Sequence, residues 1–459
     1  MFDTIAAAST GPGLAALGVI RLSGPEAAAI CDRLFKPNSR FPKPSLMPGY
    51  TMAYGSWRDL EGKELDQLVL AAFRAPHSYT GEDLFELSHH GGSQVRRSLL
   101  ESLYAAGARP AEAGEFSKRA FLNGKMDLTE AEAVMDLIAA ETERQQELAL
   151  QEMSGSLAKA VASLRSSLIN LLATLENTLE FSEENVEEAD LTFLRQGLEK
   201  VLKQINLTLA GWRQGKVLAD AFRVSILGLP NAGKSSLLNS ILGESRAIVS
   251  DISGTTRDTL EARVQIAGLP ILLTDTAGLR DSEDLIEREG VSRAKAAAGQ
   301  ADLVLWLHDP LQAEASLKAV AELRRELGTE VQLCEVVGKC DLPQAELLAR
   351  SLKTGRYIYW SKEEPARLDD LREVIAKAYA ELGPEHAGGV LIHNLRHKQL
   401  LDQAKVALDL ALQSLADPQA LDMTAAMIRN GLASISAISQ AEISDQLVEE
   451  IFSRFCVGK

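Results

Sequence analysis

The residues best suited to chemistry stand together in one stretch, FRVSILGLPNAGKSS, at positions 222–236. Gly228, Gly233, Lys234 and Ser235 have the spacing G-x-x-x-x-G-K-[ST], directly after a short apolar run. Glycines let successive backbone N–H groups curl around a phosphate, and the positive end of the following helix adds to the attraction. The pattern therefore predicts a phosphate-binding loop, with Lys234 on the β- and γ-phosphates and Ser235 on Mg²⁺. The expected nucleotide contacts in this loop are Asn231, Ala232, Gly233, Lys234, Ser235 and Ser236.

Two stretches after this loop favour a GTPase over an ATPase. GTTRD (254–258) stands where a GTPase carries the threonine, here Thr256, that completes the Mg²⁺ shell when the γ-phosphate is present. ILLTDTAG (271–278) is an apolar strand ending in D-x-x-G, where Asp275 would hold the metal through its water and Gly278 would donate to the γ-phosphate. The order and spacing match a Ras-like G domain. The expected contacts here are Ser250, Asp251, Ile252, Ser253, Gly254, Thr255, Thr256, Asp275, Thr276, Ala277 and Gly278.

The part that would read the base departs from the usual pattern. GTPases read guanine with N-K-x-D, and here Gly338 takes the place of the asparagine before Lys339 and Asp341. Asp341 can still accept hydrogen bonds from guanine N1 and N2, and Lys339 can still cover the ring, so we expect weak affinity with a retained preference for guanine. Restoring the asparagine, Gly338→Asn, is expected to tighten binding. The usual S-A-K loop is altered as well, with Ser361 following Trp360.

Composition describes an ordinary globular chain of about three domains. The 459 residues are 46% hydrophobic and 24% charged, and no apolar run approaches the roughly 18 residues of a membrane span. Without a signal segment, and with Cys31, Cys334, Cys340 and Cys456 scattered, we expect free thiols in a reducing cytoplasm and no membrane partner. The net charge of −16 argues against a protein that coats nucleic acid through its overall field.

The remaining elements must position these loops. Short apolar runs broken by Gly and Pro predict strands in the N-terminal part, with strands at 65–73 and in LFELSHHGG (84–92) and a helix over 93–106, which is a mixed α/β domain. His89 and His90 could be read as metal ligands, but neighbours on a strand point to opposite faces. We therefore do not predict a metal site there.

From Thr129 the pattern becomes mainly helical, and Thr129 with Glu132 fits a capping box. A leucine stripe over 157–179 predicts a long bundle helix, and helical patterns return only after the G domain, from residue 395 to the end. The predicted class is multidomain, α+β and α/β. It comprises a mixed α/β domain (1–123), a discontinuous helical bundle (124–219 and 385–459) and an inserted Ras-like P-loop G domain (220–384).

With these pieces placed, the whole chain resembles the MnmE (TrmE) family of tRNA-modifying GTPases. The resemblance is carried by DTIAAASTGPG, YTGEDLFELSHHGG, AGEFSKRAFLNGKMDLTEAEAVMDLI and the terminal FSRFCVGK as well as by the G domain. It implies a folate-binding N-terminal domain and a cytoplasmic homodimer. It further implies a hetero-oligomer with the flavoprotein MnmG (GidA), which carries FAD, modifying carbon 5 of the wobble uridine of certain tRNAs with a tetrahydrofolate one-carbon unit.

The resemblance also assigns residues in the N-terminal domain and at the end of the chain. It implies that Arg21, Glu86, Lys125 and Lys459 bind 5-formyltetrahydrofolate, and a cationic pair there would suit the carboxylates of folate. Taken alone, these residues are equally well read as surface charges. Cys456 lies in the family's C-x-G-K ending, where a catalytic thiol and a small buried residue are both open.

In the G domain the resemblance implies a way to hydrolyse GTP without the usual water-orienting glutamine. Ras-like enzymes orient water with a glutamine after D-x-x-G, whereas this chain has Leu279. The family implies that K⁺ takes the place of an arginine finger when two G domains face each other, and that Glu287 positions water through a second water. The implied K⁺ ligands are Asn231, Ser250, Ile252 and Thr255, and the implied catalytic residues are Glu287, Lys234 and Asn231. Without the resemblance, Glu287 reads as a solvated charge.

Two other classes of function remain open at this point. One is a one-carbon transfer protein whose G domain is regulatory or impaired, which the glycine at position 338 favours. The other is a GTPase of ribosome assembly or RNA binding, which the acidic charge and the absence of a recognisable RNA-binding module disfavour.

Overall fold

The computed structural model describes residues 3–181, 188–244, 260–275, 298–327, 331–352, 357–382, 390–439, 445–453, 455 and 457–458. It has two compact units. The first contains 1–135, 152–161 and 436–459, and the second contains 136–151 and 162–435. The predicted fold class is confirmed, since a mixed α/β part, a helical part and a P-loop α/β part are all present. The three-domain boundaries stay a prediction.

The first unit is built on a seven-stranded sheet in the order β3-β4-β5-β6-β2-β1-β7. Its strands are antiparallel except for the parallel pair β1 and β7. The bounds are β1 Ile5–Ala8, β2 Leu17–Ser23, β3 Phe35–Pro37, β4 Thr51–Arg58, β5 Glu64–Phe73, β6 Leu84–His90 and β7 Arg109–Pro110. A 3₁₀ turn, η1 (Pro44–Leu46), precedes β4.

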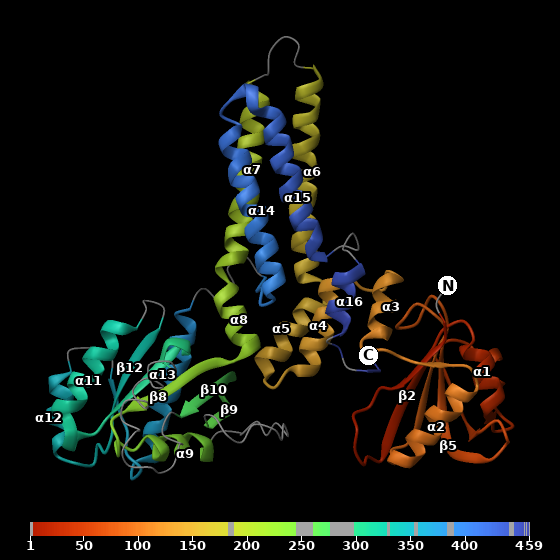
Figure 1. The fold of residues 1–459 in the computed structure, drawn as a ribbon, viewed down its shortest axis with the longest axis horizontal. Coiled ribbons are helices and arrows are strands. Elements are labelled where there is room, and N and C mark those ends of the chain that lie inside the picture. The colour runs from red at the N-terminus through yellow and green to blue at the C-terminus, as the bar shows by residue number, and fades with distance from the viewer. Residues whose placement is uncertain are drawn as a thin grey trace. The chain divides into compact units, whose positions relative to one another are not determined.

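Two helices, α1 (Ala27–Leu34) and α2 (Ser93–Ala105), lie against one face of this sheet (Figure 1). Their apolar residues join alternate strand residues in one core, because side chains of a strand point alternately to its two faces. The same alternation buries His89 and exposes His90, whose Nδ1 lies 2.7 Å from Asp66 Oδ1. The two histidines thus face opposite sides, as predicted.

Three helices of the same unit pack around phenylalanines. They are α3 (Glu115–Leu122), α4 (Leu128–Ala139) and α16 (Asp445–Ser453), and their shared cluster includes Phe121, Phe452 and Phe455. The predicted capping box was displaced by two residues. Asp127 Oδ1 accepts from the Glu130 N–H at 2.9 Å and Glu130 Oε2 accepts from the Asp127 N–H at 2.8 Å. Asp127 therefore caps α4 in place of Thr129, since an aspartate two residues earlier caps at least as well.

The segment after α16 returns to the N-terminal strands. Val457 forms a β-bridge with Ala113, and Ser9 Oγ donates to the carbonyl of Gly458 at 3.0 Å. Gly458 has φ +94°, and a Cβ on it would overlap the carbonyl oxygen of Ala8. Only glycine fits this close approach of two backbones.

The second unit contains most of a bundle of long helices. Four helices run alongside one another, namely α6 (Ser156–Phe181), α7 (Glu188–Ala210), α14 (Leu395–Ser414) and α15 (Leu421–Ser439) (Figure 1). Two shorter helices are α5 (Glu143–Met153) and α8 (Trp212–Asp220). The leucine stripe is confirmed as core, because Leu164, Leu168, Leu171 and Leu175 are all buried. A short 3₁₀ turn, η4 (Pro418–Ala420), joins α14 to α15.

A six-stranded sheet in the order β13-β12-β11-β8-β10-β9 forms the P-loop part. The first five strands in this order are parallel and β9 is antiparallel to β10. The bounds are β8 Phe222–Gly228, β9 Leu260–Ile266, β10 Leu269–Asp275, β11 Leu303–His308, β12 Gln332–Val337 and β13 Tyr357–Tyr359. Every residue of β11 is buried, as expected for a parallel strand covered on both faces.

Helices cover both faces of this sheet. α9 (Lys234–Glu244) and α13 (Leu368–Ala380) pack on one face, and α11 (Ala313–Glu326) packs on the other with Trp306. α12 (Gln344–Ser351) packs beside α11, and the 3₁₀ turns η2 (Pro310–Gln312) and η3 (Pro365–Arg367) precede α11 and α13. Among the described residues, no helix is both long and apolar enough to cross a membrane.

Candidate functional site

The phosphate loop lies between β8 and α9, where the sequence predicts it. Gly228 has φ +154° and Gly233 has φ +100°, values that glycine adopts without a steric penalty. Asn231 also lies in the left-handed region, at φ +61°, which asparagine tolerates better than most residues. Because α9 begins at Lys234, its first N–H groups point toward the loop and form an anion-binding end.

Lys234 lies over this loop. Its ammonium donates to the carbonyls of Gly228 and Leu229 at 3.0 and 2.9 Å. Ser235 and Ser236, in the first turn of α9, are exposed, whereas Ala232 is buried beneath the loop. A positive charge and the N-terminal turn of a helix at the end of a buried strand fit a nucleotide polyphosphate.

The ends of neighbouring strands bring the other expected residues to the same edge of the sheet. Asp275 ends β10 beside Ile226 of β8, Lys339 and Asp341 follow β12, and Ser361 follows β13. Carboxyl ends of parallel strands form one crevice, which is where ligands bind in open α/β sheets. The structure therefore brings the phosphate loop and the predicted base-reading residues together.

Three polar contacts hold the base-reading residues. Ser361, which is buried, donates from Oγ to Asp341 Oδ1 at 2.6 Å. The Lys339 ammonium lies 2.8 Å from Asp309 Oδ2 and 3.5 Å from the carbonyl of Asn231, so it links this loop to the phosphate loop. Burial alone would raise the pKa of Asp309, but the bonds from Lys339 and from the Leu311 N–H outweigh it and hold this pKa below its usual value.

Gly338 is tightly enclosed, and this changes one expectation. Its N–H donates to the carbonyl of His308 at 2.9 Å, and a Cβ built on it would lie only 2.9 Å from that oxygen and 3.1 Å from Leu307 Cδ1. Backbone atoms yield less easily than the end of a flexible side chain, so an asparagine here strains the loop. With this geometry we expect Gly338→Asn to weaken binding, contrary to the expectation from the motif alone.

A second group of polar residues lies in the N-terminal sheet. Arg21 and Glu86 are direct partners on β2 and β6, and Arg21 Nε donates to Glu86 Oε1 at 2.8 Å. The Arg21 guanidinium also lies over the ring of Tyr79, 5.0 Å from its centroid. Lys125 donates to the carbonyl of Pro76 at 3.0 Å. Arg21 and Lys125 thus both contact the loop 76–82, a grouping that fits an anionic aromatic ligand.

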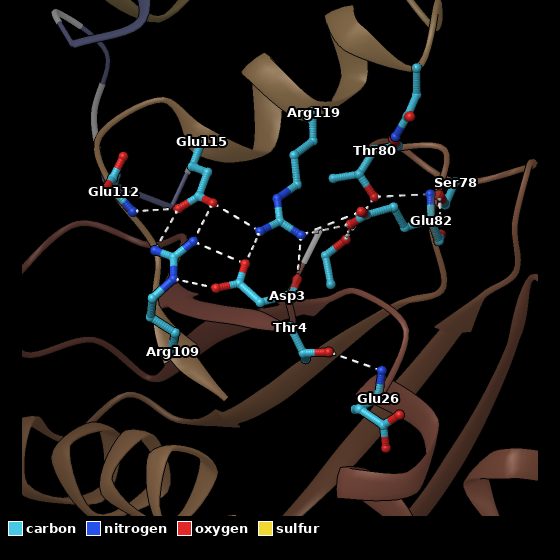
Figure 2. Close-up of polar contacts among 12 residues, drawn as sticks. Asp3, Thr4, Glu26, Ser78, Thr80, Glu82, Arg109, Glu112, Glu115 and Arg119 are labelled. Carbon is cyan, nitrogen blue, oxygen red and sulfur yellow. Dashed lines mark hydrogen bonds and ion pairs between the residues drawn. The ribbon is translucent and has the colours of Figure 1, made fainter. Parts of the chain in front are cut away.

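A buried arginine holds that loop, as Figure 2 shows. Arg119, 1% exposed, donates to Asp3 Oδ1 at 2.8 Å and to Glu115 Oε1 at 2.9 Å, and it lies 3.2 Å from Glu82 Oε2. Arg109 contacts Asp3 and Glu115 from the other side at 2.7 Å each. The network fixes the loop to α3 and to Asp3, which lies two residues before β1.

The charges in this network change the acidity of its carboxylates. The hydrogen bond from Arg109 is the largest effect on Asp3 and, with the bond from Arg119, lowers its pKa to about 2 against a smaller effect of burial. Burial alone would raise the pKa of Glu115, but bonds from Arg109, the Glu112 N–H and Arg119 lower it overall. Both carboxylates are therefore ionised at neutral pH.

Several expected site residues lie outside the described residues. They are Ser250, Asp251, Ile252, Ser253, Gly254, Thr255, Thr256, Thr276, Ala277, Gly278, Glu287, Cys456 and Lys459. Of the predicted K⁺ ligands the structure describes Asn231, and of the predicted Mg²⁺ ligands it describes Ser235.

Sequence reasoning missed Asp309, Tyr79 and Arg119. Asp309 directly follows the apolar run 303–307 and His308, at the same sheet edge as the phosphate loop, and that position was a usable signal. Tyr79 and Arg119 acquire their roles only through contacts distant in sequence, which no local pattern records.

Comparison with known families decides the assignment of the chain. The model described as "GTP-binding protein TrmE N-terminus" matches residues 4–125, and "MnmE helical domain" matches residues 128–456. The curated "tRNA modification GTPase MnmE" of Geobacillus thermodenitrificans is 40% identical over 470 residues, covering 100% of this chain and 99% of that protein. The one of Shouchella clausii is 37% identical over 463 residues, with 100% and 99% coverage. The chain belongs to the MnmE family.

Membership of the MnmE family confirms the resemblance drawn from the sequence motifs. The two family models match residues 4–125 and 128–456, and these ranges include most of both compact units. The relatives align along the full chain and carry the name of a GTPase, so the G domain is accounted for together with the N-terminal sheet and the bundle.

Proposed function

We propose that the chain is a K⁺-stimulated GTPase that takes part in modifying carbon 5 of the wobble uridine of certain tRNAs. The proposed GTPase activity is supported mainly by one observation. The phosphate loop, Lys339 and the Asp341–Ser361 pair lie at one edge of a parallel sheet. The family name of the relatives carries the link to tRNA.

In this proposal the residues of the chain divide the work on GTP. The N–H groups at the start of α9 and Lys234 hold the β- and γ-phosphates, Ser235 and Thr256 hold Mg²⁺, and Asp341 accepts from guanine. When bound beside Asn231, K⁺ would supply the positive charge that an arginine finger supplies elsewhere. Asn231 projects from a left-handed position of an exposed turn, which suits an oxygen ligand directed outward. Glu287 positions the water.

A salt comparison tests the K⁺ proposal. GTP turnover by the full chain should be much higher in KCl than in NaCl at equal ionic strength, and Asn231→Ala should abolish the difference. Because alanine at φ +61° costs roughly 1–2 kcal/mol, Asn231→Gly is the better variant, since it removes the amide oxygen without backbone strain. Equal turnover of wild type in the two salts would remove K⁺ from the mechanism.

The N-terminal sheet is proposed to bind 5-formyltetrahydrofolate or a related folate, in a homodimer that works with the flavoprotein MnmG and its FAD. Support comes from the Arg21–Glu86 pair, the stacked Tyr79 and Lys125 at one loop. Arg21 and Lys125 would bind the folate carboxylates and Glu86 would fix the guanidinium. Arg21→Ala should lower folate affinity, measured by calorimetry, whereas Arg58→Ala, an arginine on another strand of the same sheet, should not.

The biological role has a direct test. Mass spectrometry of tRNA from cells lacking the protein should show wobble uridines without their carbon 5 substituent, restored by the wild-type gene. Normal modification with loss of GTP-dependent ribosome maturation would favour the ribosome-assembly alternative. Proposed domain boundaries are 1–123, 124–219 with 385–459, and 220–384, and they are expected to appear as proteolytic junctions.

A further inference from the structure

A buried polar network lies beneath the base-reading loop. His308, the last residue of β11, is fully buried, with Nδ1 2.8 Å from Ser316 Oγ and Nε2 2.8 Å from Glu335 Oε2. Trp306 Nε1 donates to the same Ser316 oxygen at 3.1 Å, and Arg324 donates to the other Glu335 oxygen at 2.7 Å. The network joins β11, β12 and α11.

Hydrogens can be placed so that all of these contacts are satisfied. Trp306 donates to Ser316, the Ser316 hydroxyl donates to His308 Nδ1, and His308 Nε2–H donates to the Glu335 carboxylate. The ring is therefore fixed through both nitrogens. Apolar residues at two such buried positions commonly give a core of equal or greater stability. Stability alone does not account for the network.

The network ends at the loop that reads the base. The carbonyl of His308 accepts from Gly338 N–H at 2.9 Å, and Asp309, the next residue, holds Lys339 at 2.8 Å. A Cβ at position 338 would lie 2.9 Å from that same carbonyl oxygen, so a larger residue there would require the end of β11 or the loop to move. Gly338 stands where other GTPases carry the asparagine of N-K-x-D, and Asp341 follows three residues later.

We propose that His308 is a positioning residue for guanine recognition, with Ser316 and Glu335 holding its ring. Its immobilised carbonyl sets the backbone of the loop from Gly338 to Asp341, a task that falls to the backbone here because position 338 has no side chain. Asp341 is thereby aimed at N1 and N2 of guanine. This inference rests on the proposed binding of guanine nucleotides.

The test compares GDP with IDP, whose base lacks the N2 amino group, by competition against a fluorescent GDP analogue on the full chain. The GDP-to-IDP affinity ratio reports the contact of Asp341 with N2. His308→Leu should lower this ratio about tenfold, the effect of losing one well-aligned hydrogen bond. His308→Gln, whose amide can still donate to Glu335, should keep the ratio near that of wild type.

A matched control is Cys334→Ala, which trims a buried residue of β12 beside Glu335 but on the opposite face of the sheet. It should lower stability without changing the ratio. If His308→Leu does not fold, Ser316→Ala provides the test, because it removes the hydrogen bond to His308 Nδ1 with little loss of volume. It should also lower the GDP-to-IDP affinity ratio. An unchanged ratio in the folded variant would assign the network to packing and overturn the inference. A wild type without preference for GDP over IDP would instead refute the assignment of Asp341.

Discussion

The hydroxyl of Ser361 donates a hydrogen bond of 2.6 Å to the carboxylate of Asp341, and the two residues follow different strands of the sheet. Ser361 is 3% exposed whereas Asp341 is exposed, so a fixed donor orients a carboxylate that faces solvent. Hydrogen bonds to a charged group are among the stronger ones. The pair is therefore a pre-oriented acceptor for two neighbouring N–H groups of a base.

Ser361→Ala should weaken GDP binding about tenfold, because the carboxylate loses the bond that orients it. Calorimetric titration with GDP measures the effect. Ser351→Ala, a serine on the exposed surface of α12, is the matched control and should bind like wild type.

Asp341→Asn should change the base preference from guanine to xanthine nucleotides, since an amide N–H can pair with the xanthine carbonyl. Unaltered base preference in Asp341→Asn would show that another group reads the base.

Gly338→Asn should fail to tighten nucleotide binding and should weaken it instead. The new Cβ would lie 2.9 Å from the His308 carbonyl oxygen, which the loop cannot vacate without losing the bond from the N–H of residue 338. Gly338→Ala carries the same Cβ without the amide and separates strain from hydrogen bonding. Both variants should show lower affinity for GDP in the same titration. Tighter binding by the asparagine variant would mean that β11 yields and that the missing amide was the larger effect.

Glu287→Ala should bind a non-hydrolysable GTP analogue normally while its kcat falls by roughly 10²- to 10⁴-fold, because a residue that positions water acts on the transition state. Single-turnover hydrolysis in KCl measures the chemical step. Glu283→Ala removes a charge from the same acidic stretch and should behave like wild type. Equal turnover in the two variants would return Glu287 to the role of a surface charge.

Acid should loosen the first compact unit through the Arg119 network. Folding lowers the pKa of Asp3 from 3.8 to about 2 and lowers that of Glu115, so their stabilisation is complete above their unfolded pKa values and is lost as pH falls toward 2. Because Asp3 is 57% exposed, screening keeps its share below about 1 kcal/mol. The urea midpoint should therefore be level between pH 7 and 5 and fall below about pH 4.

The ¹⁹F resonance of 5-fluorotryptophan at Trp57, a buried residue of the same unit, can follow this transition. Asp3→Asn should lower the midpoint at neutral pH and flatten the part of the acid response that Asp3 contributes. A midpoint in Asp3→Asn with the wild-type pH response would show that Asp3 takes no part in it.

The phosphate loop, the leucine-rich helix and the strand alternation at His89 and His90 could be predicted from the sequence, because each depends on residues within one or two turns of chain. The N-cap of α4 was misplaced because Asp127 and Thr129 both suit that position, and only the geometry distinguishes them. The motif also identifies Gly338 as the position where other GTPases carry an asparagine.

Contacts between remote residues could not be predicted. The carbonyl of His308, 30 positions earlier, limits the space at Gly338. Arg119 donates a hydrogen bond to Asp3, which lies 116 positions away in the sequence. No periodicity or spacing records which carboxylate will lie beside which guanidinium once the strands have paired. Such contacts determine which residues a motif position, such as 338, can accommodate.

The bond between Ser9 and Gly458 spans 449 positions of the sequence and has a consequence for synthesis. A ribosome adds about 5–20 residues per second, so roughly 20 to 90 seconds separate the emergence of strand β1 from that of the segment that closes against it. During that interval the phenylalanine cluster lacks Phe452 and Phe455, and the edge around Ala8 and Ala113 is uncovered. The sheet of the first unit, although made early, can therefore reach its final form only late in synthesis.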